Sequence, residues 1–297
     1  MRDDWSKRVV NYVFELDEWL PRYPLEDNPH HYSGEDITSP ADICNNELLR
    51  REMPDQYDWG EAVPIDVFVM AVGEPPDRHV TKIGGLPYRP AGAPWPVSDK
   101  QKPLKFLAQL NFCDSKDIVG KLPGDVLLAF AEFDEEYPDY FEVMHFEWQP
   151  LGLADLVEPA DVPDHPYHFD PCYGHICRTV SYPQARYFVR TQAPFEPLCR
   201  GLEVWSDYFI LQYQATQIGS APFIIQQEPK LRERIIATIN SVQPEPHKVY
   251  PWVNHPLPLL PEGKWNLESP YLMLEDLGCI YISIDDENKL HWEMMGY

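Results

Sequence analysis

The sequence predicts an α+β protein, mainly antiparallel β-sheets, whose β-rich part is a duplicated unit arranged about a pseudo-twofold axis. The first observation is a segment that occurs twice, as Thr81–Tyr88 and Thr216–Phe223. In each copy a glycine turn comes shortly before a proline. Glycine tolerates positive φ and proline keeps its predecessor extended, so each copy predicts a sharp turn between extended segments. The second observation is the 32 prolines spread along the chain, which favour short strands over long helices.

A helical N-terminal extension is predicted ahead of this part, over residues 1–62. Apolar residues three and four positions apart between Trp5 and Leu20 predict an amphipathic helix, and Ser39 followed by Pro40 predicts the start of another. Residues 63–297 then form the duplicated domain, with a first half at about 63–156 and a second at about 187–297.

Strands in the first half are predicted from apolar alternation or from continuous apolar runs. They are Val63–Val72, Leu104–Leu110, Val126–Phe133 and Tyr140–Trp148, the last two forming a hairpin. Asp114 is expected to cap a short helical turn. The stretch 157–171 is rich in Asp, Glu, Pro and His and predicts either a connector between the halves or a long loop.

The second half is expected to contain strands, one helix and a C-terminal hairpin. Tyr208–Gln214 predicts a strand and Phe223–Gln226 an extended segment. A helix beginning at Pro229 is predicted from the spacing of Leu231, Ile235, Ile236 and Ile239. The hairpin is expected over Gly278–Ile284 and Lys289–Glu293, around a polar turn.

The chain carries a formal net charge of −24, from 48 acidic and 24 basic residues. Such a surface repels phosphate backbones and anionic lipid, and no basic patch offsets it, so we expect neither a nucleic-acid nor a membrane partner. One interpretation of the charge is solubility alone. The other is an acidic face that captures a basic protein, such as a ribosomal protein or a basic toxin.

Six cysteines are present, and most lie within apolar or β-prone runs. Met1–Asp4 does not resemble the start of a secretory leader, and no apolar run approaches the ~18 residues that a membrane span requires. The sequence therefore predicts a cytoplasmic protein with reduced thiols.

Catalytic and cofactor motifs are not found in the sequence. It lacks a Gly-x-Ser-x-Gly elbow, a His-Glu-x-x-His helix and a phosphate loop, so we expect no enzyme and no cofactor. Zinc is a weak possibility between His165 and Cys177, because thiolate and imidazole are its ligands. The spacing matches no familiar zinc pattern, and the alternative is a loop with a buried cysteine; the weak candidates are His168, Cys172, His175 and Cys177.

Several segments resemble the YwqG-like family of bacterial proteins, a domain of unknown function numbered 1963. In the first half these are Lys82–Pro87, Trp95-Pro96, Pro103–Leu110 and Leu122-Pro123-Gly124. In the second half they are Ile218–Gln226 and Asp276–Tyr281. The resemblance spans roughly residues 63–293 and leaves the N-terminal extension outside it.

The Gly-Gly-x-Pro turn followed by Pro-Leu-x-Phe-Leu-x-Gln-Leu is also similar to the eukaryotic programmed-cell-death-protein-two family. Members of that family are regarded as chaperones that receive a newly made ribosomal protein. They carry paired cysteines ahead of the Pro-Leu segment, where Val97–Lys102 has none, and Ser220 replaces a glycine of the second motif. The resemblance to a metal-free YwqG-like module is therefore closer.

A guest groove is hypothesised at the two turn motifs, with two glutamines binding an extended peptide and a tryptophan forming an aromatic wall. The alternatives are glutamines that bond the backbone of their own turn and a tryptophan that packs in the core. The candidate residues are Gly84, Gly85, Pro87, Trp95, Gln109, Gly219, Pro222 and Gln226.

The leading functional hypothesis is a non-enzymatic, chaperone-like protein-binding module for a basic or extended client. An immunity protein that neutralises a toxin is a second hypothesis of the same class. An enzyme of unknown substrate, with a pocket between the two halves, is the alternative from another class.

Overall fold

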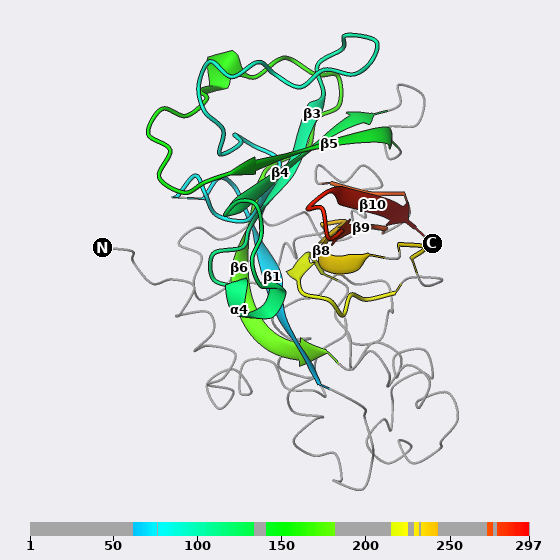
Figure 1. Cartoon of the computed structure of the whole chain (residues 1–297). Coiled ribbons are helices and arrows are strands. Elements are labelled where there is room, and N and C mark those ends of the chain that lie inside the picture. Colours follow the sequence, from blue (N-terminus) through cyan, green and yellow to red (C-terminus); the bar gives the residue numbers. More distant parts are fainter. Residues whose placement is uncertain are drawn as a thin grey trace, which may run out of the picture.

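Ten strands form one sheet in this chain, as a computed structural model shows (Figure 1). The structure describes residues 62–75, 77–133, 141–181, 215–224, 229–231, 233–242, 272–275 and 278–296. The strands are β1 (Val63–Val72), β2 (Lys82–Ile83), β3 (Lys105–Asn111), β4 (Val126–Phe133), β5 (Phe141–Gln149), β6 (Cys172–Ser181), β7 (Gln217–Ile218), β8 (Arg234–Asn240), β9 (Cys279–Ile284) and β10 (Leu290–Met295). Helical structure within these ranges is limited to a short α-helix, α4 (Lys116–Val119), and the 3-10 turn Pro159–Asp161.

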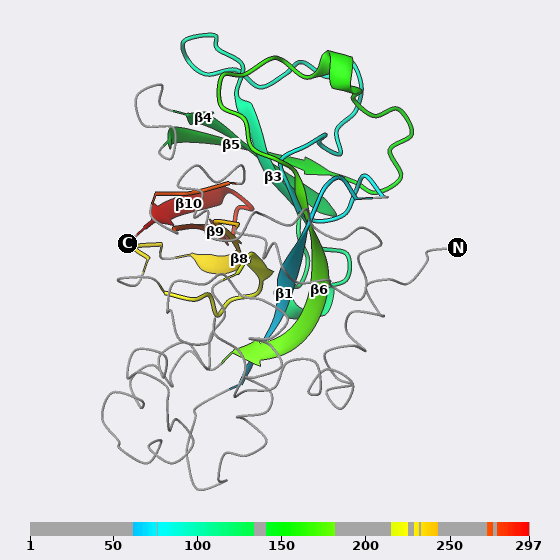
Figure 2. The same cartoon turned by 180° about the vertical axis from the view of Figure 1, so that it is seen from behind.

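The strand order is β10-β9-β8-β7-β1-β6-β2-β3-β4-β5, and every ladder between neighbours is antiparallel. The long strands β1 and β6 form the centre of the sheet and pair along their whole length, from Val63 opposite Ser181 to Val72 opposite Cys172. In both views the group β3–β5 lies above this pair and the group β8–β10 lies beside it (Figures 1 and 2). The prediction of mainly antiparallel sheet is therefore confirmed.

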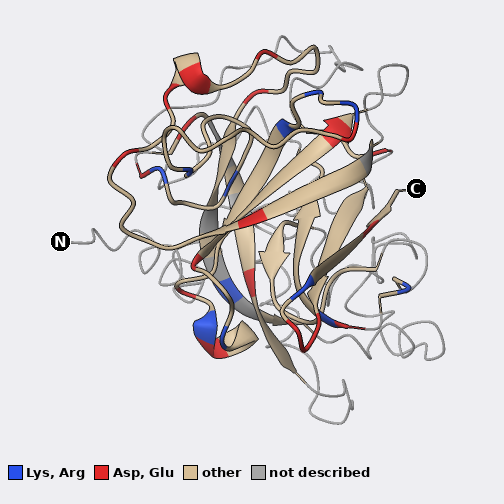
Figure 3. Cartoon of the chain, turned by 45° about the horizontal axis from the view of Figure 1, so that its top comes forward, with Lys and Arg blue, Asp and Glu red and all other residues tan. Residues whose placement is uncertain are grey.

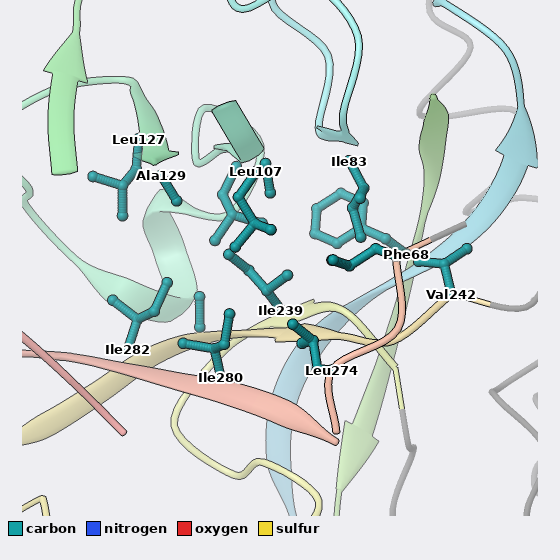
Figure 4. Packing of buried hydrophobic residues seen from close by; sticks show 14 of the residues in the cluster. Phe68, Ile83, Leu107, Leu127, Ala129, Ile239, Val242, Leu274, Ile280 and Ile282 are labelled. Atoms are coloured by element: carbon teal, nitrogen blue, oxygen red, sulfur yellow. The ribbon is translucent and has the colours of Figure 1, made fainter. Parts of the chain in front are cut away.

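The two outer groups of strands face one another across a shared apolar core. Leu107, Leu127 and Ala129 of β3 and β4 belong to the same buried cluster as Ile239 and Ile280 of β8 and β9. Figure 4 shows these side chains pointing toward each other from opposite sides. Since each of these residues is at most 1% exposed, neither group buries its inner face without the other.

Strands appear where apolar side chains alternate or run continuously, as predicted. β1 and β4 have the expected bounds, and β3, β5, β9 and β10 agree with their predictions within a few residues. The polar turn before β10 is also present: Asp285 accepts the main-chain N–H groups of Glu287 and Lys289. The expected helical turn is α4, whose N-cap is Ser115 rather than Asp114.

The helix predicted from Pro229 is wrong, because residues 234–240 form β8 between β7 and β9. The register of β8 against β9 shifts between Ile235 and Ala237, which marks a bulge at Ile236. A bulge interrupts the two-residue alternation, so Ile236 and Ile239 both join the core although they are three positions apart. Helical spacing of apolar residues thus arises here inside a strand.

Several predicted features lie outside the described residues. These are the helical extension over residues 1–61, the strand Tyr208–Gln214, and Gln226. The part of the chain between residues 62 and 296 that the structure describes contains no helix that is long and apolar enough to cross a membrane.

Candidate functional site

The first turn motif forms a tight corner after β2. Gly84 and Gly85 have φ angles of +67° and +71°, in the left-handed region that glycine accepts readily. The Gly84 N–H donates to the Leu107 carbonyl at 2.8 Å, which ties the corner to β3. A Cβ on Gly84 would lie 2.7 Å from the Phe169 ring, so close packing as well as φ requires glycine.

An ion pair between a buried lysine and an exposed glutamate stabilises this corner. The Lys82 side chain is fully buried, and its Nζ lies 2.8 Å from Oε2 of Glu74. The other carboxylate oxygen, Oε1, accepts the Leu86 N–H at 2.7 Å. Burial lowers the pKa of Lys82, and the neighbouring Glu74 carboxylate partly opposes that shift. One carboxylate therefore stabilises both the buried cation and the turn backbone.

Gln109 is fully buried and bonds the backbone of this same corner. Its Oε1 accepts the Tyr88 N–H at 2.8 Å, and its Nε2 donates to the carbonyls of Arg78 and Val80, each at 2.7 Å. Both amide hydrogens are thus engaged within the chain. A peptide carbonyl that accepted a hydrogen bond from Gln109 would have to displace one of these bonds.

The second turn motif forms a corner with the same main-chain bonding. Gly219 has a φ of +142°, and its N–H donates to the Ile236 carbonyl at 2.9 Å. A Cβ on Gly219 would lie 2.8 Å from Cγ2 of Ile65. Pro222 is buried beside it, as Pro87 is in the first corner.

The residue that matches Gln109 in strand register is Thr238. Lys82 pairs with Gln109 in the first corner, and Gln217 pairs with Thr238 in the second. The Thr238 hydroxyl donates to the Ala215 carbonyl at 3.1 Å, much as Gln109 donates to Val80. Gln226, the second glutamine predicted for the groove, lies outside the described residues.

The second corner leaves more polar atoms without partners than the first. Gln217 donates from Nε2 to the Ala221 carbonyl at 3.0 Å, but its buried Oε1 has no hydrogen-bond partner among the described residues. Asn240 likewise has an unpartnered Nδ2, whereas Nδ2 of Asn111 donates to the His79 carbonyl at 3.0 Å. The two corners share a backbone frame and differ in side-chain bonding.

Trp95 is only partly buried and packs on the outer face of β3 and β4. Its Nε1 donates to the Leu104 carbonyl at 2.7 Å, and its ring meets the edge of Phe130 at a centroid distance of 5.4 Å. The guanidinium carbon of Arg89 lies over the same Trp95 ring, 5.6 Å from its centroid. Arg89 also binds both carboxylate oxygens of Glu147, at 2.7 and 3.0 Å, a contact that the sequence reasoning missed.

A second charged cluster that the sequence reasoning missed links β1, β6 and α4. Asp66 is fully buried and stands opposite Arg178 in the β1–β6 ladder. Arg178 donates to both Asp66 oxygens, at 2.8 and 2.9 Å, and the Ser115 hydroxyl donates to Asp66 at 2.6 Å. Arg178 also binds Asp117 and holds the pKa of that carboxyl below its usual range. This cluster fixes the centre of the sheet.

The weak zinc candidates are not brought together by what the structure describes. Cys172 is buried in the main core at the start of β6, and burial raises the pKa of its thiol. His168 is 68% exposed and its Nε2 lies 4.0 Å from Oδ1 of Asp164. The side chains of His175 and Cys177 lie outside the description, and the described residues contain no group of three or more metal-binding side chains.

The predicted groove residues gather in two places. Gly84, Gly85, Pro87 and Gln109 lie at the corner after β2, whereas Gly219 and Pro222 lie at the corner after β7. The strands β7, β1, β6 and β2 are consecutive in the sheet. Three inter-strand spacings, roughly 14 Å, therefore separate the corners across the sheet. They are also offset along it, since Ile218 pairs with Asp66 whereas Ile83 pairs with Cys172, which is opposite Val72. They do not form a continuous surface by direct contact.

Comparison with known proteins identifies a family for the chain. A family model described as a domain of unknown function, DUF1963, matches residues 81–291. The chain belongs to this family. The DUF1963 match begins at the first corner, includes the second and ends within β10, while β1 lies ahead of it. No curated protein matches the chain.

Proposed function

We propose that this chain is a non-enzymatic, chaperone-like module that holds an extended segment of a basic client protein. The observation that carries the proposal is the pair of strands at the ends of the sheet. Among the described strands, β5 hydrogen-bonds only with β4, and β10 only with β9. A strand edge that lacks a partner offers main-chain donors and acceptors to an added strand.

The charge of the molecule supports a basic client. The net charge is −24, and Figure 3 shows acidic residues distributed over the loops around the sheet. An excess of one sign raises the encounter rate with the opposite sign and makes binding dependent on salt. The similarity of the first turn motif to the programmed-cell-death-protein-two family favours the same kind of client.

We infer that the sheet consists of two copies of one five-strand unit, β1–β5 and β6–β10. Exchanging β1 with β6, β2 with β7, β3 with β8, β4 with β9 and β5 with β10 gives the same strand order, read from the other end of the sheet. In addition, β3 and β8 carry bulges at matching positions, Leu107 and Ile236. Under this exchange the Val69–His175 pair maps onto itself, so the axis would pass there. The second copy would then begin with β6, ahead of the expected start near Tyr187.

Binding to permanently unfolded proteins tests the proposed function. The full chain would be titrated with a reduced and alkylated basic protein, and with an acidic protein of similar length treated identically. We expect saturable binding of the basic protein that weakens as salt is raised, and much weaker binding of the acidic one. Equal binding of both proteins, or binding of neither at low salt, would contradict the proposal.

A further inference from the structure

The two edge strands present half-buried apolar residues toward the same core. Met144, Phe146 and Trp148 alternate along β5, and Leu290, Trp292 and Met294 alternate along β10. All six pack against the main cluster and all six remain partly exposed. We call these six residues the edge strip.

A direct side-chain contact shows that the two edges approach each other. The rings of Phe141, at the start of β5, and Trp292, in β10, have centroids 5.8 Å apart. No ladder joins the two strands in the described part of the sheet. The edge strip therefore borders a place where apolar side chains meet but the main chains remain unpaired.

The end of the edge strip at which β10 begins is acidic. Asp285, Asp286 and Glu287 form the turn that leads into β10. Because β5 and β10 run in opposite directions, the same end holds Trp148, near the end of β5, whose buried indole Nε1 has no hydrogen-bond partner among the described residues. A main-chain carbonyl is the group that would satisfy it.

We propose that an extended client segment adds as a strand along the edge of β5 that forms no ladder with another described strand, with alternate apolar side chains on the edge strip. Its lysine or arginine residues lie toward the acidic end, near Asp286. This inference rests on the proposed function and specifies where the client binds. β5 is the chosen edge because its nine residues offer a longer ladder than the six of β10.

The matched pair Val143 and Val97 provides the test. Val143 is 40% exposed on β5, and Val97 is 46% exposed on the proline-rich segment after β2. The probe is a synthetic peptide of roughly ten residues, a usual strand length, that alternates valine with lysine. Its control replaces each lysine by glutamate. A photo-crosslinking amino acid is placed at residue 143 or 97, and amide hydrogen exchange is followed with and without peptide.

We expect crosslinking at residue 143 but not at 97, and slower exchange of β5 amides in the presence of the lysine peptide. Val143→Lys should weaken binding of the lysine peptide by up to about fivefold, because it places a positive charge and a long polar side chain beside the lysines of the added strand. Val97→Lys should leave binding unchanged. Both residues are exposed, so each variant is expected to fold.

The outcomes separate this inference from the proposed function. If the lysine peptide binds while protection and crosslinking lie away from β5, the location is wrong and the binding function stands. If Val143→Lys and Val97→Lys bind equally well, strand addition at β5 is also rejected. If unfolded basic protein and lysine peptide both fail to bind, the proposed function fails with it.

Discussion

At the scale of single residues, the most unusual group is the lysine enclosed beneath the first corner. A fully buried ammonium group loses its hydration and depends on the carboxylate it meets. Lys82 has that carboxylate in Glu74, whose side chain is 37% exposed. The matching residue in the second corner, Gln217, avoids this cost by being neutral.

Replacement of Lys82 by glutamine, the residue at the matching position of the second corner, should change how the free energy of unfolding depends on pH. The folded-state pKa of Lys82 lies below its ordinary value of 10.5, so between these two values the unfolded chain binds more protons than the folded one. The stability contributed by Lys82 is therefore complete above pH 10.5 and is lost as the pH falls through the lowered pKa. The free energy of unfolding of the wild type, minus that of Lys82→Gln, should rise with pH in this window.

Denaturant unfolding at closely spaced pH values checks this expectation. The subtraction cancels the contributions of titrating groups that both proteins share, such as Tyr173, whose pKa is raised by burial. A difference that is flat or falls with pH would contradict the assignment of a lowered pKa to Lys82.

A second prediction compares two glycines with the same backbone and different surroundings. Gly85 and Gly92 have φ angles of +71° and +74°. A Cβ on Gly92 meets nothing within 4 Å, so Gly92→Ala should cost only the left-handed strain of about 1–2 kcal/mol. A Cβ on Gly85 overlaps Oε1 of Glu74, so Gly85→Ala also displaces the partner of Lys82 and of the Leu86 N–H.

We expect Gly85→Ala to lower the free energy of unfolding by at least about 1 kcal/mol more than Gly92→Ala, because the displaced groups lose their hydrogen bonds. Urea titration of both variants measures the difference. Equal losses would show that Glu74 moves without weakening the corner.

At the scale of elements, the β1–β6 ladder depends on a charged pair within its apolar surroundings. Asp66 has no exposed surface, and Arg178 is 30% exposed. Removal of the guanidinium leaves Asp66 buried with only the Ser115 hydroxyl as its side-chain partner. Arg178→Met should therefore destabilise the protein by on the order of 3 kcal/mol.

The control is the exposed ion pair between Lys116 and Asp125, in which the lysine is 57% exposed. Lys116→Met should cost no more than about 1 kcal/mol, since solvent screens such pairs. Chemical denaturation measures both variants. Similar losses in the two would mean that the cluster around Asp66 is not a structural anchor.

Strands with a clear apolar pattern could be predicted from the sequence, and strands defined by distant partners could not. β4 is a continuous apolar run between polar turns, which suffices to place it. β6 contains Gly174, His175 and Arg178, and its partner β1 lies about a hundred residues away in sequence. Gly174 is required because a Cβ would lie 2.7 Å from Cβ of Phe68, a contact that only the assembled sheet creates.

The candidate site was likewise predictable only in its backbone. The repeated glycines and prolines indicated both corners, since φ requirements are local. The bond between Glu74 and Lys82, and that between Arg89 and Glu147, join residues whose separations follow no motif. Neither has a local signal in the sequence, apart from the presence of a lysine among otherwise buried residues.

At the scale of the whole molecule, the two five-strand segments of the chain are interleaved. β1 pairs with β6 and β7, and β6 pairs with β1 and β2, so each leading strand lies between strands of the other segment. The segments are joined in sequence by the connector 157–171, part of which is the exposed 3-10 turn Pro159–Asp161. Cutting this connector removes no ladder.

We expect a chain cleaved after Asp161, at an introduced protease site, to remain one particle. The fragments would keep the whole β1–β6 ladder and the shared core between them. Size-exclusion chromatography should show them eluting together in buffer and apart only in denaturant. Fragments that separate without denaturant would contradict the interleaved arrangement.

The uniform antiparallel pairing limits how many strands could be inserted between β5 and β10, the two ends of the sheet. Reversal at each of nine successive ladders gives β5 and β10 opposite directions. A single inserted segment can be antiparallel to only one of them and must run parallel to the other. An even number of segments, such as a β-hairpin, satisfies both edges at once and would close the sheet into a ring.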